Sequence, residues 1–380
     1  MSAQSHQAKR CGVPWGLFGM IGLLVAAEQY VARHELDFTS HIPLDWRMSG
    51  RAASGQVAHC KLLCFGDSEV KHAVQSQVIA HRLGRAAYCL AVIGGQPPSS
   101  YVLLRRALES GARPAAIVMN AFPSLLACDL RINERQWPEL LTMCECAELA
   151  WTARDPRLFV TTMLARVFPS VAARKEMRAA TLAALGGFPN GSWQEAAAYQ
   201  RNWSVNQGAQ VVARNPRFSD DVGPIDAHDS KHQWKCKPAN AAYLERFLAL
   251  AAAHKIPVFW LMPTISPAWQ VRREQTGLDL PYVRFVRSLQ ARFANLIVVD
   301  ARHSGYDRTV FLDPAHLDRR GAAVLSADLA DIIGRHVART ETHGPRWIEL
   351  PAFRDRPIDE PLEDLDQSRV ALQLAKGRRR

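Results

Sequence analysis

The stretch Lys61-Leu-Leu-Cys-Phe-Gly-Asp-Ser-Glu-Val70 decides the expected fold of this 380-residue chain. Its apolar run Leu62–Phe65 has the length of a buried strand, and Gly66 breaks that run. Ser68 follows almost at once, ahead of residues 70–83, whose pattern predicts a helix. A strand, a tight glycine turn and a helix expose a serine hydroxyl at the end of a parallel sheet, where the helix N-terminus offers unpaired N–H groups to a developing negative charge. The stretch therefore predicts a nucleophilic serine, Ser68.

Further short apolar runs alternate with helical segments along the chain. After the first strand, we expect strands at residues 86–93, 115–119, 257–262 and 296–300. Short, nearly unbroken apolar strands separated by helices indicate a parallel sheet that is covered on both faces. The expected fold class is therefore α/β, a three-layer flavodoxin-like parallel sheet of strand order 2-1-3-4-5.

The sequence divides into a catalytic domain and flanking segments. We expect the domain at residues 60–340, with a helical insertion at residues 121–238 where the alternation of strands and helices lapses. The flanking segments are a cytoplasmic tail, a membrane anchor or signal, a spacer and a disordered charged tail, at residues 1–10, 11–27, 28–59 and 341–380.

Residues 11–27 form a run of seventeen residues without a charge. That length is at the short limit for a membrane-spanning helix and also fits the core of a removable signal peptide. Lys9-Arg10 precede the run, and basic residues favour the cytoplasmic side of a membrane. We therefore expect membrane contact through the N-terminal segment and an extracytoplasmic (periplasmic) catalytic domain, with cleavage of the segment as the alternative.

The net charge of +11 suits contact with anionic lipid, an acidic polymer or nucleic acid. Nucleic acid is disfavoured, because the arginines are scattered and no zinc-finger, RNA-binding or leucine-zipper pattern accompanies them. Among the eight cysteines, Cys144-Glu-Cys146 has too short a spacing for half of an ordinary zinc site. His228, His232 and Cys236 have helical metal-ligand spacing but lie in a polar, loop-like stretch, so we expect no metal and no other cofactor.

A serine hydroxyl needs a base to become a good nucleophile, and Asp313-Pro-Ala-His316 supplies a candidate pair. The three-residue separation lets Asp313 reach the Nδ1–H of His316, which leaves Nε2 to take the proton of Ser68. The other histidine considered, His72, is expected to face solvent.

Two further segments follow strands that neighbour the first strand of the expected sheet. Gly94-Gly95 comes after the second strand and Asn120 after the third, so both should meet Ser68 at the carboxyl edge. A glycine N–H is open to close approach by a substrate, because no Cβ blocks it. The N–H groups of Ser68 and Gly95 and the side-chain amide of Asn120 are therefore the expected oxyanion donors.

These residues resemble the motifs of the SGNH/GDSL family of esterases and acyltransferases. The resemblance rests on Gly66-Asp67-Ser68, Gly94-Gly95, Asn120 and Asp313-x-x-His316-Leu317, and it covers roughly residues 58–130 and 255–335. It implies a serine nucleophile, an Asp-x-x-His orienter and base, and an oxyanion hole completed by a Gly and an Asn. Met119-Asn120-Ala121 departs from the family pattern Gly-x-Asn-Asp.

The sequence is most similar to the membrane-anchored branch of that family, whose members act on acyl groups of cell-surface or exported polysaccharides. The implied function is a serine-dependent esterase or O-acyltransferase that acts on acetyl or other acyl esters of carbohydrate through an acyl-serine. A membrane protein that donates acyl groups would be a partner in transfer. The alternative is a non-catalytic anchored domain that binds a glycan or a partner protein.

Overall fold

The computed structural model describes residues 15–33, 41–168, 170, 174–187, 192–220, 234–338, 345–359 and 361–377. Its six strands form one parallel sheet of order β2-β1-β3-β4-β5-β6. The strands are β1 Leu62–Phe65, β2 Ala87–Cys89, β3 Ala116–Met119, β4 Val258–Met262, β5 Leu296–Asp300 and β6 Trp347–Glu349. The expected α/β class with a parallel sheet is confirmed, and β6 adds an unexpected strand beside β5.

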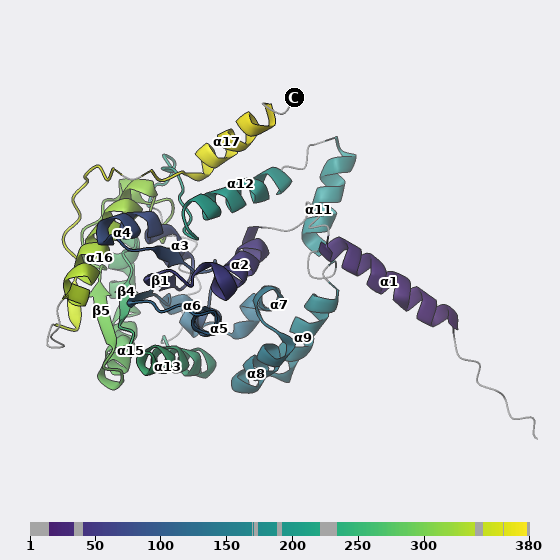
Figure 1. Ribbon diagram of the computed structural model, residues 1–380, viewed down its shortest axis with the longest axis horizontal. Coiled ribbons are helices and arrows are strands. Elements are labelled where there is room, and N and C mark those ends of the chain that lie inside the picture. The colour runs from purple at the N-terminus through teal and green to yellow at the C-terminus, as the bar shows by residue number, and fades with distance from the viewer. Residues whose placement is uncertain are drawn as a thin grey trace, which may run out of the picture.

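Helices precede, connect and follow these strands (Figure 1). Before the sheet and in its first half they are α1 Trp15–Arg33, α2 His41–Arg51, the π-helical η1 Ala52–Gln56, α3 Ser68–Ala73, α4 Ser76–Leu83 and α5 Pro97–Glu109. Between β3 and β4 they are α6 Pro123–Ala127, η2 Leu130–Asn133, α7 Trp137–Leu140, α8 Met143–Ala153, α9 Pro156–Val167, α11 Arg174–Leu185, α12 Ser192–Val205 and α13 Pro238–Ala253. After β4 they are α14 Pro267–Gln275, α15 Asp279–Arg292, η4 Arg308–Val310, α16 Arg319–Ala338 and α17 Leu365–Gly377.

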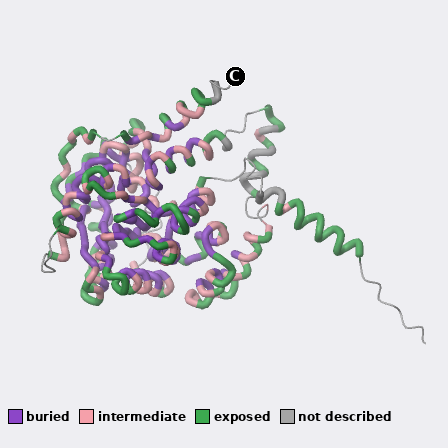
Figure 2. Tube along the Cα trace, in the orientation of Figure 1, coloured by how far each residue is buried: buried purple, intermediate pink, exposed green. Residues whose placement is uncertain are grey.

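The sheet has a separate hydrophobic core on each face, because successive side chains of a strand point to opposite sides. Leu63 and Phe65 of β1 join the core that contains residues of α5 and α13. Leu62 and Cys64 join the core that contains residues of α4 and α16. The helices of the two cores lie on opposite sides of the sheet in Figure 1, and the sheet and the inner helix faces are the buried parts in Figure 2. The fold is thus a three-layer arrangement.

Residues 41–59 belong to the folded domain, although the sequence predicts an irregular spacer at residues 28–59. Trp46 of α2 has no solvent exposure and donates its indole N–H to the Ile93 carbonyl oxygen at 2.9 Å. Apolar contacts to the rest of the chain, which no local pattern reveals, order this segment.

The expected disorder of residues 341–380 is wrong for residues 345–359 and 361–377. Here β6 pairs in parallel with β5, and α17 lies beside α12 (Figure 1). Arg201 of α12 forms a bidentate ion pair with Glu363, with distances of 2.6 and 2.7 Å. Residues 339–344, 360 and 378–380 lie outside the described residues.

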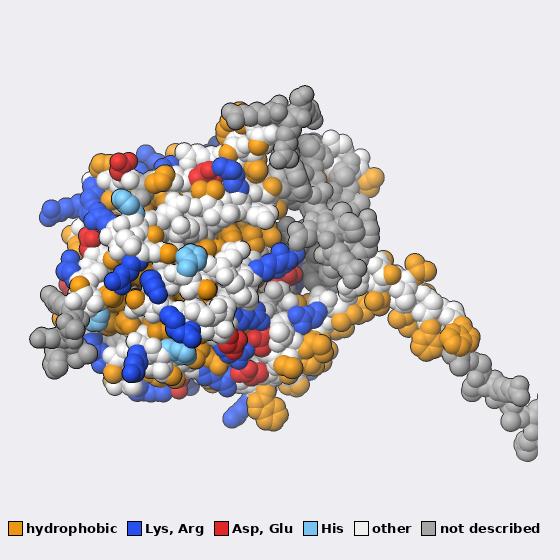
Figure 3. Space-filling model, viewed as in Figure 1, with side chains coloured by type: hydrophobic (Ala, Val, Ile, Leu, Met, Phe, Trp, Pro, Cys, Tyr) orange, Lys and Arg blue, Asp and Glu red, His pale blue; other side chains and the backbone are white. Residues whose placement is uncertain are grey.

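The N-terminal helix α1 extends from the body of the protein and exposes apolar side chains along its length (Figures 1 and 3). Within the described ranges, no helix combines the length and the hydropathy that crossing a membrane requires. The expected membrane-spanning anchor at residues 11–27 is therefore wrong. The expected cytoplasmic tail at residues 1–10 lies outside the described residues.

Candidate functional site

A tight turn after β1 holds the candidate nucleophile. Gly66 has a φ of +141°, and a Cβ at this position would lie 2.7 Å from the Asn120 carbonyl oxygen, so only glycine fits. Asp67 caps α3 by accepting the Glu69 N–H at 2.9 Å through Oδ1, and its Oδ2 accepts the Phe122 N–H at 2.9 Å. The buried Asp67 carboxylate therefore joins two segments, the turn that carries Ser68 and the loop that follows β3.

The expected helix at residues 70–83 is interrupted. Helix α3 ends at Ala73 and α4 begins at Ser76, with Val74 and Gln75 in extended conformation between them. The Gln75 N–H donates to Ser326 Oγ on α16 at 2.7 Å, which secures the break. Ser68 is thus the first residue of a short separate helix and not of a long one.

The structure brings Ser68, His316 and Asp313 together in one hydrogen-bonded chain. The Ser68 hydroxyl lies 2.8 Å from His316 Nε2. His316 Nδ1 lies 2.7 Å from Asp313 Oδ2 and 2.9 Å from Oδ1. A nucleophile, a base and an orienting carboxylate are within hydrogen-bond distance of one another, in the order that the sequence predicts.

Local hydrogen bonds hold the loop of the base and its orienter. Asp313 Oδ1 also accepts the N–H groups of Ala315 at 2.8 Å and His316 at 3.0 Å. The Leu312 N–H donates to the His316 carbonyl oxygen at 2.8 Å, which closes the loop. These bonds fix the Asp313 carboxylate next to Nδ1 of the imidazole ring.

Asp313 has a lowered pKa. Its partial burial favours the neutral carboxyl, but the hydrogen bond and charge of His316 and the two backbone N–H groups outweigh burial and lower the pKa. An ionised Asp313 accepts the proton on Nδ1 of His316. Nε2 is then the unprotonated atom that faces the Ser68 hydroxyl.

The side chain of Asn120 is hydrogen-bonded to the buried carboxyl of Glu69, a residue that no sequence motif singles out. Asn120 Nδ2 donates to Glu69 Oε2 at 2.8 Å, and the two residues are only 1% and 3% exposed. Burial, together with the nearby Asp67 carboxylate, raises the pKa of Glu69 well above its ordinary value. Nδ2 carries two hydrogen atoms, so Glu69 orients the amide and leaves one N–H for another acceptor.

Gly95 does not have the role that the sequence predicts for it. Its N–H donates to the Val92 carbonyl oxygen at 2.9 Å and is therefore not available to an oxyanion. A Cβ on Gly95 would lie 2.6 Å from the Gly66 carbonyl oxygen. This close approach to the turn that precedes Ser68 explains the glycine.

His72 was expected to face solvent, and that expectation is wrong. Its ring is partly buried and meets the ring of His316 edge-on, with 4.9 Å between the centroids and an interplanar angle of 61°. Burial and the charge of His316 lower the pKa of His72 well below its ordinary value, so the ring stays neutral. The four-residue spacing from Ser68, one helical turn, is the signal that places both residues on one face of α3.

The metal-ligand pattern considered in the sequence falls largely on residues that are not described. His228 and His232 lie outside the described residues, and Cys236 directs its thiol to the Lys237 carbonyl oxygen. In the described part of the chain, no three His, Cys, Asp or Glu side chains form a group that could hold a metal ion.

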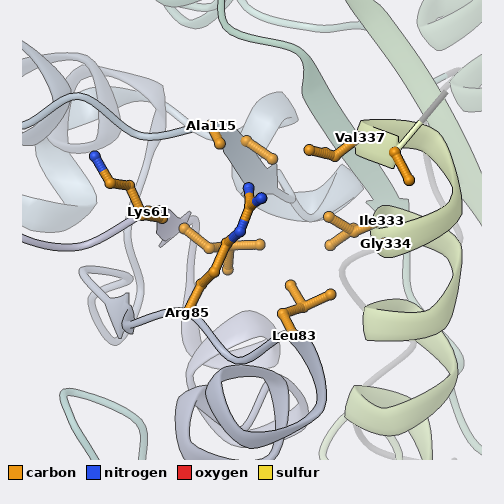
Figure 4. A pocket seen from close by; sticks show the side chains of 10 residues that line it. Lys61, Leu83, Arg85, Ala115, Ile333, Gly334 and Val337 are labelled. Atoms are coloured by element: carbon orange, nitrogen blue, oxygen red, sulfur yellow. The ribbon is translucent and has the colours of Figure 1, made fainter. Parts of the chain in front are cut away.

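Figure 4 shows a separate pocket of about 150 Å³. It lies at the amino ends of strands β1 and β3, at the other end of the strands from Ser68. Its walls include Lys61 and Ala115, which precede β1 and β3, together with Arg85, Ile333 and Val337. Since Ser68 follows the carboxyl end of β1, this pocket is not part of the Ser68 site.

At the carboxyl ends of the strands, Ser68, His316 and Asp313 thus form a hydrogen-bonded series. The buried amide of Asn120 and the buried carboxyl of Glu69 lie beside it. Such a series can activate a hydroxyl for attack on a carbonyl carbon and return the proton to a leaving group.

We also compared the chain with known proteins. No protein-family model and no curated protein matches it.

Proposed function

We propose that this protein is a serine-dependent esterase or O-acyltransferase of the SGNH type. The observation that carries the proposal is the hydrogen-bonded series from Ser68 through His316 to Asp313. The order of the elements supports it further: the serine follows β1, which lies between β2 and β3, and the Asp-x-x-His pair follows β5 and precedes α16.

Acyl transfer begins with attack of Ser68 Oγ on the ester carbonyl carbon while His316 Nε2 takes the hydroxyl proton. The Asp313 carboxylate stabilises the resulting imidazolium. Two donors serve the tetrahedral oxyanion: the Ser68 N–H, which has no intrahelical acceptor at the start of α3, and the second N–H of Asn120 Nδ2. As the C–O bond breaks, His316 gives its proton to the leaving alkoxide and the acyl-serine forms.

Removal of the acyl group repeats these steps with a new nucleophile. Water gives hydrolysis, and a carbohydrate hydroxyl gives transfer; in both, His316 takes the proton of the attacking group and returns it to Ser68. The substrate class, acyl and above all acetyl esters of cell-surface or exported carbohydrates, follows from the resemblance of the motifs. A membrane protein that supplies acyl groups would be the partner in transfer.

Two measurements on Ser68→Ala test the proposal. The variant should lose p-nitrophenyl acetate turnover, whereas Ser288→Ala, which removes an exposed hydroxyl on α15, should retain it. A serine-directed organophosphonate should add its mass to the peptide that contains Ser68. Equal turnover by the wild type and Ser68→Ala would refute the proposal. Wild-type protein that is neither active nor labelled would also refute it, and would favour the alternative of a non-catalytic domain that binds a glycan or a partner protein.

A further inference from the structure

Glu69 is a buried carboxyl next to the candidate nucleophile. It follows Ser68 in the chain, lies in the first turn of α3 and is 3% exposed. Its Oε2 atom accepts a hydrogen bond from Asn120 Nδ2 at 2.8 Å. Its Oε1 atom is buried and has no hydrogen-bond partner in the part of the chain that the structure describes. An ionised carboxylate can only accept hydrogen bonds, so an ionised Glu69 would leave Oε1 buried and unsatisfied.

Asn120 has a matching unsatisfied acceptor. It is 1% exposed, and its Oδ1 atom is also buried without a hydrogen-bond partner within the described ranges. Its main chain is held by β1, because the Asn120 N–H donates to the Phe65 carbonyl oxygen at 3.2 Å. The two acceptors that lack a donor, Glu69 Oε1 and Asn120 Oδ1, therefore belong to two side chains that one hydrogen bond already joins.

A single proton on Glu69 satisfies both acceptors. A neutral carboxyl group has one O–H donor beside one acceptor oxygen, and a primary amide likewise has N–H donors beside an acceptor oxygen. The two planar groups can therefore form a closed ring of two hydrogen bonds. Asn120 Nδ2 donates to Glu69 Oε2 in one of them, and Glu69 Oε1 donates to Asn120 Oδ1 in the other. Buried polar groups in proteins are ordinarily hydrogen-bonded, which favours this neutral form of Glu69.

The charged groups around Glu69 come from four segments. Asp67 lies in the turn before α3, where its Oδ1 accepts the Glu69 N–H at 2.9 Å, and Asp313 lies in the loop of the base. Arg273 of α14 and Tyr282 of α15 interact with Glu69 electrostatically. Burial, followed by the two aspartates, raises the pKa of Glu69, and the charge of Arg273 opposes this without cancelling it. The direction agrees with the proton that the hydrogen bonds require.

We propose that Glu69 carries a proton and donates it to Asn120 Oδ1, so that a closed acid–amide pair positions the Asn120 side chain as an oxyanion donor. The catalytic part of this inference rests on the proposed function of Ser68. Two hydrogen bonds fix the plane of the amide, and the second N–H of Nδ2 then has one fixed direction. Glu69 is thus a positioning residue that acts through Asn120. Because the oxyanion forms only after attack, the pair should affect kcat and not KM.

The kinetic test measures kcat and KM for p-nitrophenyl acetate. Glu69→Leu removes both hydrogen bonds and should lower kcat by about 10²–10³-fold, the effect of losing one oxyanion donor, with little change in KM. Glu69→Gln keeps a donor beside an acceptor and should restore most of kcat. In the Asn120→Ala background, Glu69→Leu should lower kcat little further, because the donor that it positions is gone. Equal losses in the two backgrounds, or equal losses in Glu69→Gln and Glu69→Leu, would overturn the inference.

Infrared spectroscopy detects the proton itself and needs no catalysis. A protonated carboxyl group has a C=O stretching band that an ionised carboxylate lacks. At neutral pH, Glu69→Gln should remove one such band, and Glu109→Gln, which changes an exposed side chain on α5, should leave it. An unchanged band in Glu69→Gln would overturn the inference even where Ser68 proves to be the nucleophile. Loss of the band in a protein without esterase activity would support the acid–amide pair and refute the proposed function alone.

Discussion

Lys71 and Asp45 form an ion pair in which neither side chain has any exposed surface. Asp45 Oδ1 accepts from Lys71 Nζ, and its Oδ2 accepts the Ile93 N–H at 2.8 Å. Lys71 lies in α3, one turn after Ser68, whereas Asp45 lies in α2. The pair therefore connects the N-terminal part of the domain to the helix that carries the candidate nucleophile.

Lys71→Met should destabilise the protein by about 3–5 kcal/mol, because it leaves the Asp45 carboxylate buried and unpaired. The free energy of unfolding in urea measures the change. Arg82→Met breaks the exposed pair with Asp331 and should cost less than about 1 kcal/mol.

The double variant Lys71→Met/Asp45→Leu should recover part of this loss, because an apolar pair replaces an ionic pair with little net cost. Recovery should be incomplete, since the Ile93 N–H then loses its acceptor. A double variant that is less stable than Lys71→Met would contradict this account.

Asp313→Asn should reduce kcat/KM more than Asn120→Ala does. An amide at residue 313 favours the histidine tautomer whose Nε2 cannot accept the Ser68 proton, and in a serine-protease triad this change costs about 10⁴-fold. Loss of one oxyanion donor costs about 10²–10³-fold. Both variants are assayed on one activated ester. A greater loss in Asn120→Ala would mean that Asp313 does not orient the base.

Asn120→Ala should also lower stability, by about 1–3 kcal/mol, because the Glu69 carboxyl loses its hydrogen-bond donor inside the protein. Urea unfolding of this variant, alone and combined with Glu69→Gln, measures the coupling between the two side chains. If the losses in unfolding free energy of the two single variants simply add in the double variant, the two side chains do not interact.

Glu69→Gln should change how stability depends on pH. The pKa of Glu69 is raised in the folded protein, so the folded state binds its proton more tightly than the unfolded state. The stabilisation is fully present below the ordinary glutamate pKa and is lost as pH rises through the folded pKa. Urea unfolding should therefore show that Glu69→Gln gains stability over the wild type as pH rises.

The matched control for that experiment is Glu109→Gln, which changes an exposed side chain on α5. Its stability should differ from that of the wild type by the same amount at every pH. If Glu69→Gln behaves in the same way, Glu69 has no raised pKa.

His72→Ala should lower kcat by about tenfold or more, because the His316 ring loses the side chain that packs against it and moves from its productive position. His72→Phe retains a ring at this site and should restore most of the activity. Loss of activity to the same degree in both variants would instead assign a role to the imidazole nitrogens of His72.

The sequence predicts the sheet and the three hydrogen-bonded residues because both depend on short-range signals. A buried strand followed by Gly66 places Ser68, and the Asp-x-x-His spacing alone brings Asp313 to His316. The remaining prediction is that the loops of Ser68 and His316 meet. It follows from the rule that ligand-binding loops follow the carboxyl ends of parallel strands.

The features that the sequence did not predict all depend on distant contacts. Strand β6 is only three residues long, and pairing with β5 rather than any apolar periodicity creates it. The N–H of Gly95 is engaged by a turn that spacing cannot reveal. Arg273 follows another arginine in a polar helix, and only the positions of Phe122 and Trp269 show which of the two is buried.

Ser68 and His316 hydrogen-bond across 248 positions of the chain. A ribosome that adds about 5–20 residues per second needs on the order of 10–50 s to reach the histidine after it has made the serine. Throughout that interval the serine hydroxyl has no base and is chemically inert. The hydrogen-bonded series of Ser68, His316 and Asp313 can therefore form only after the loop that contains Asp313 and His316 has been made, so the candidate nucleophile stays without its base until late in synthesis.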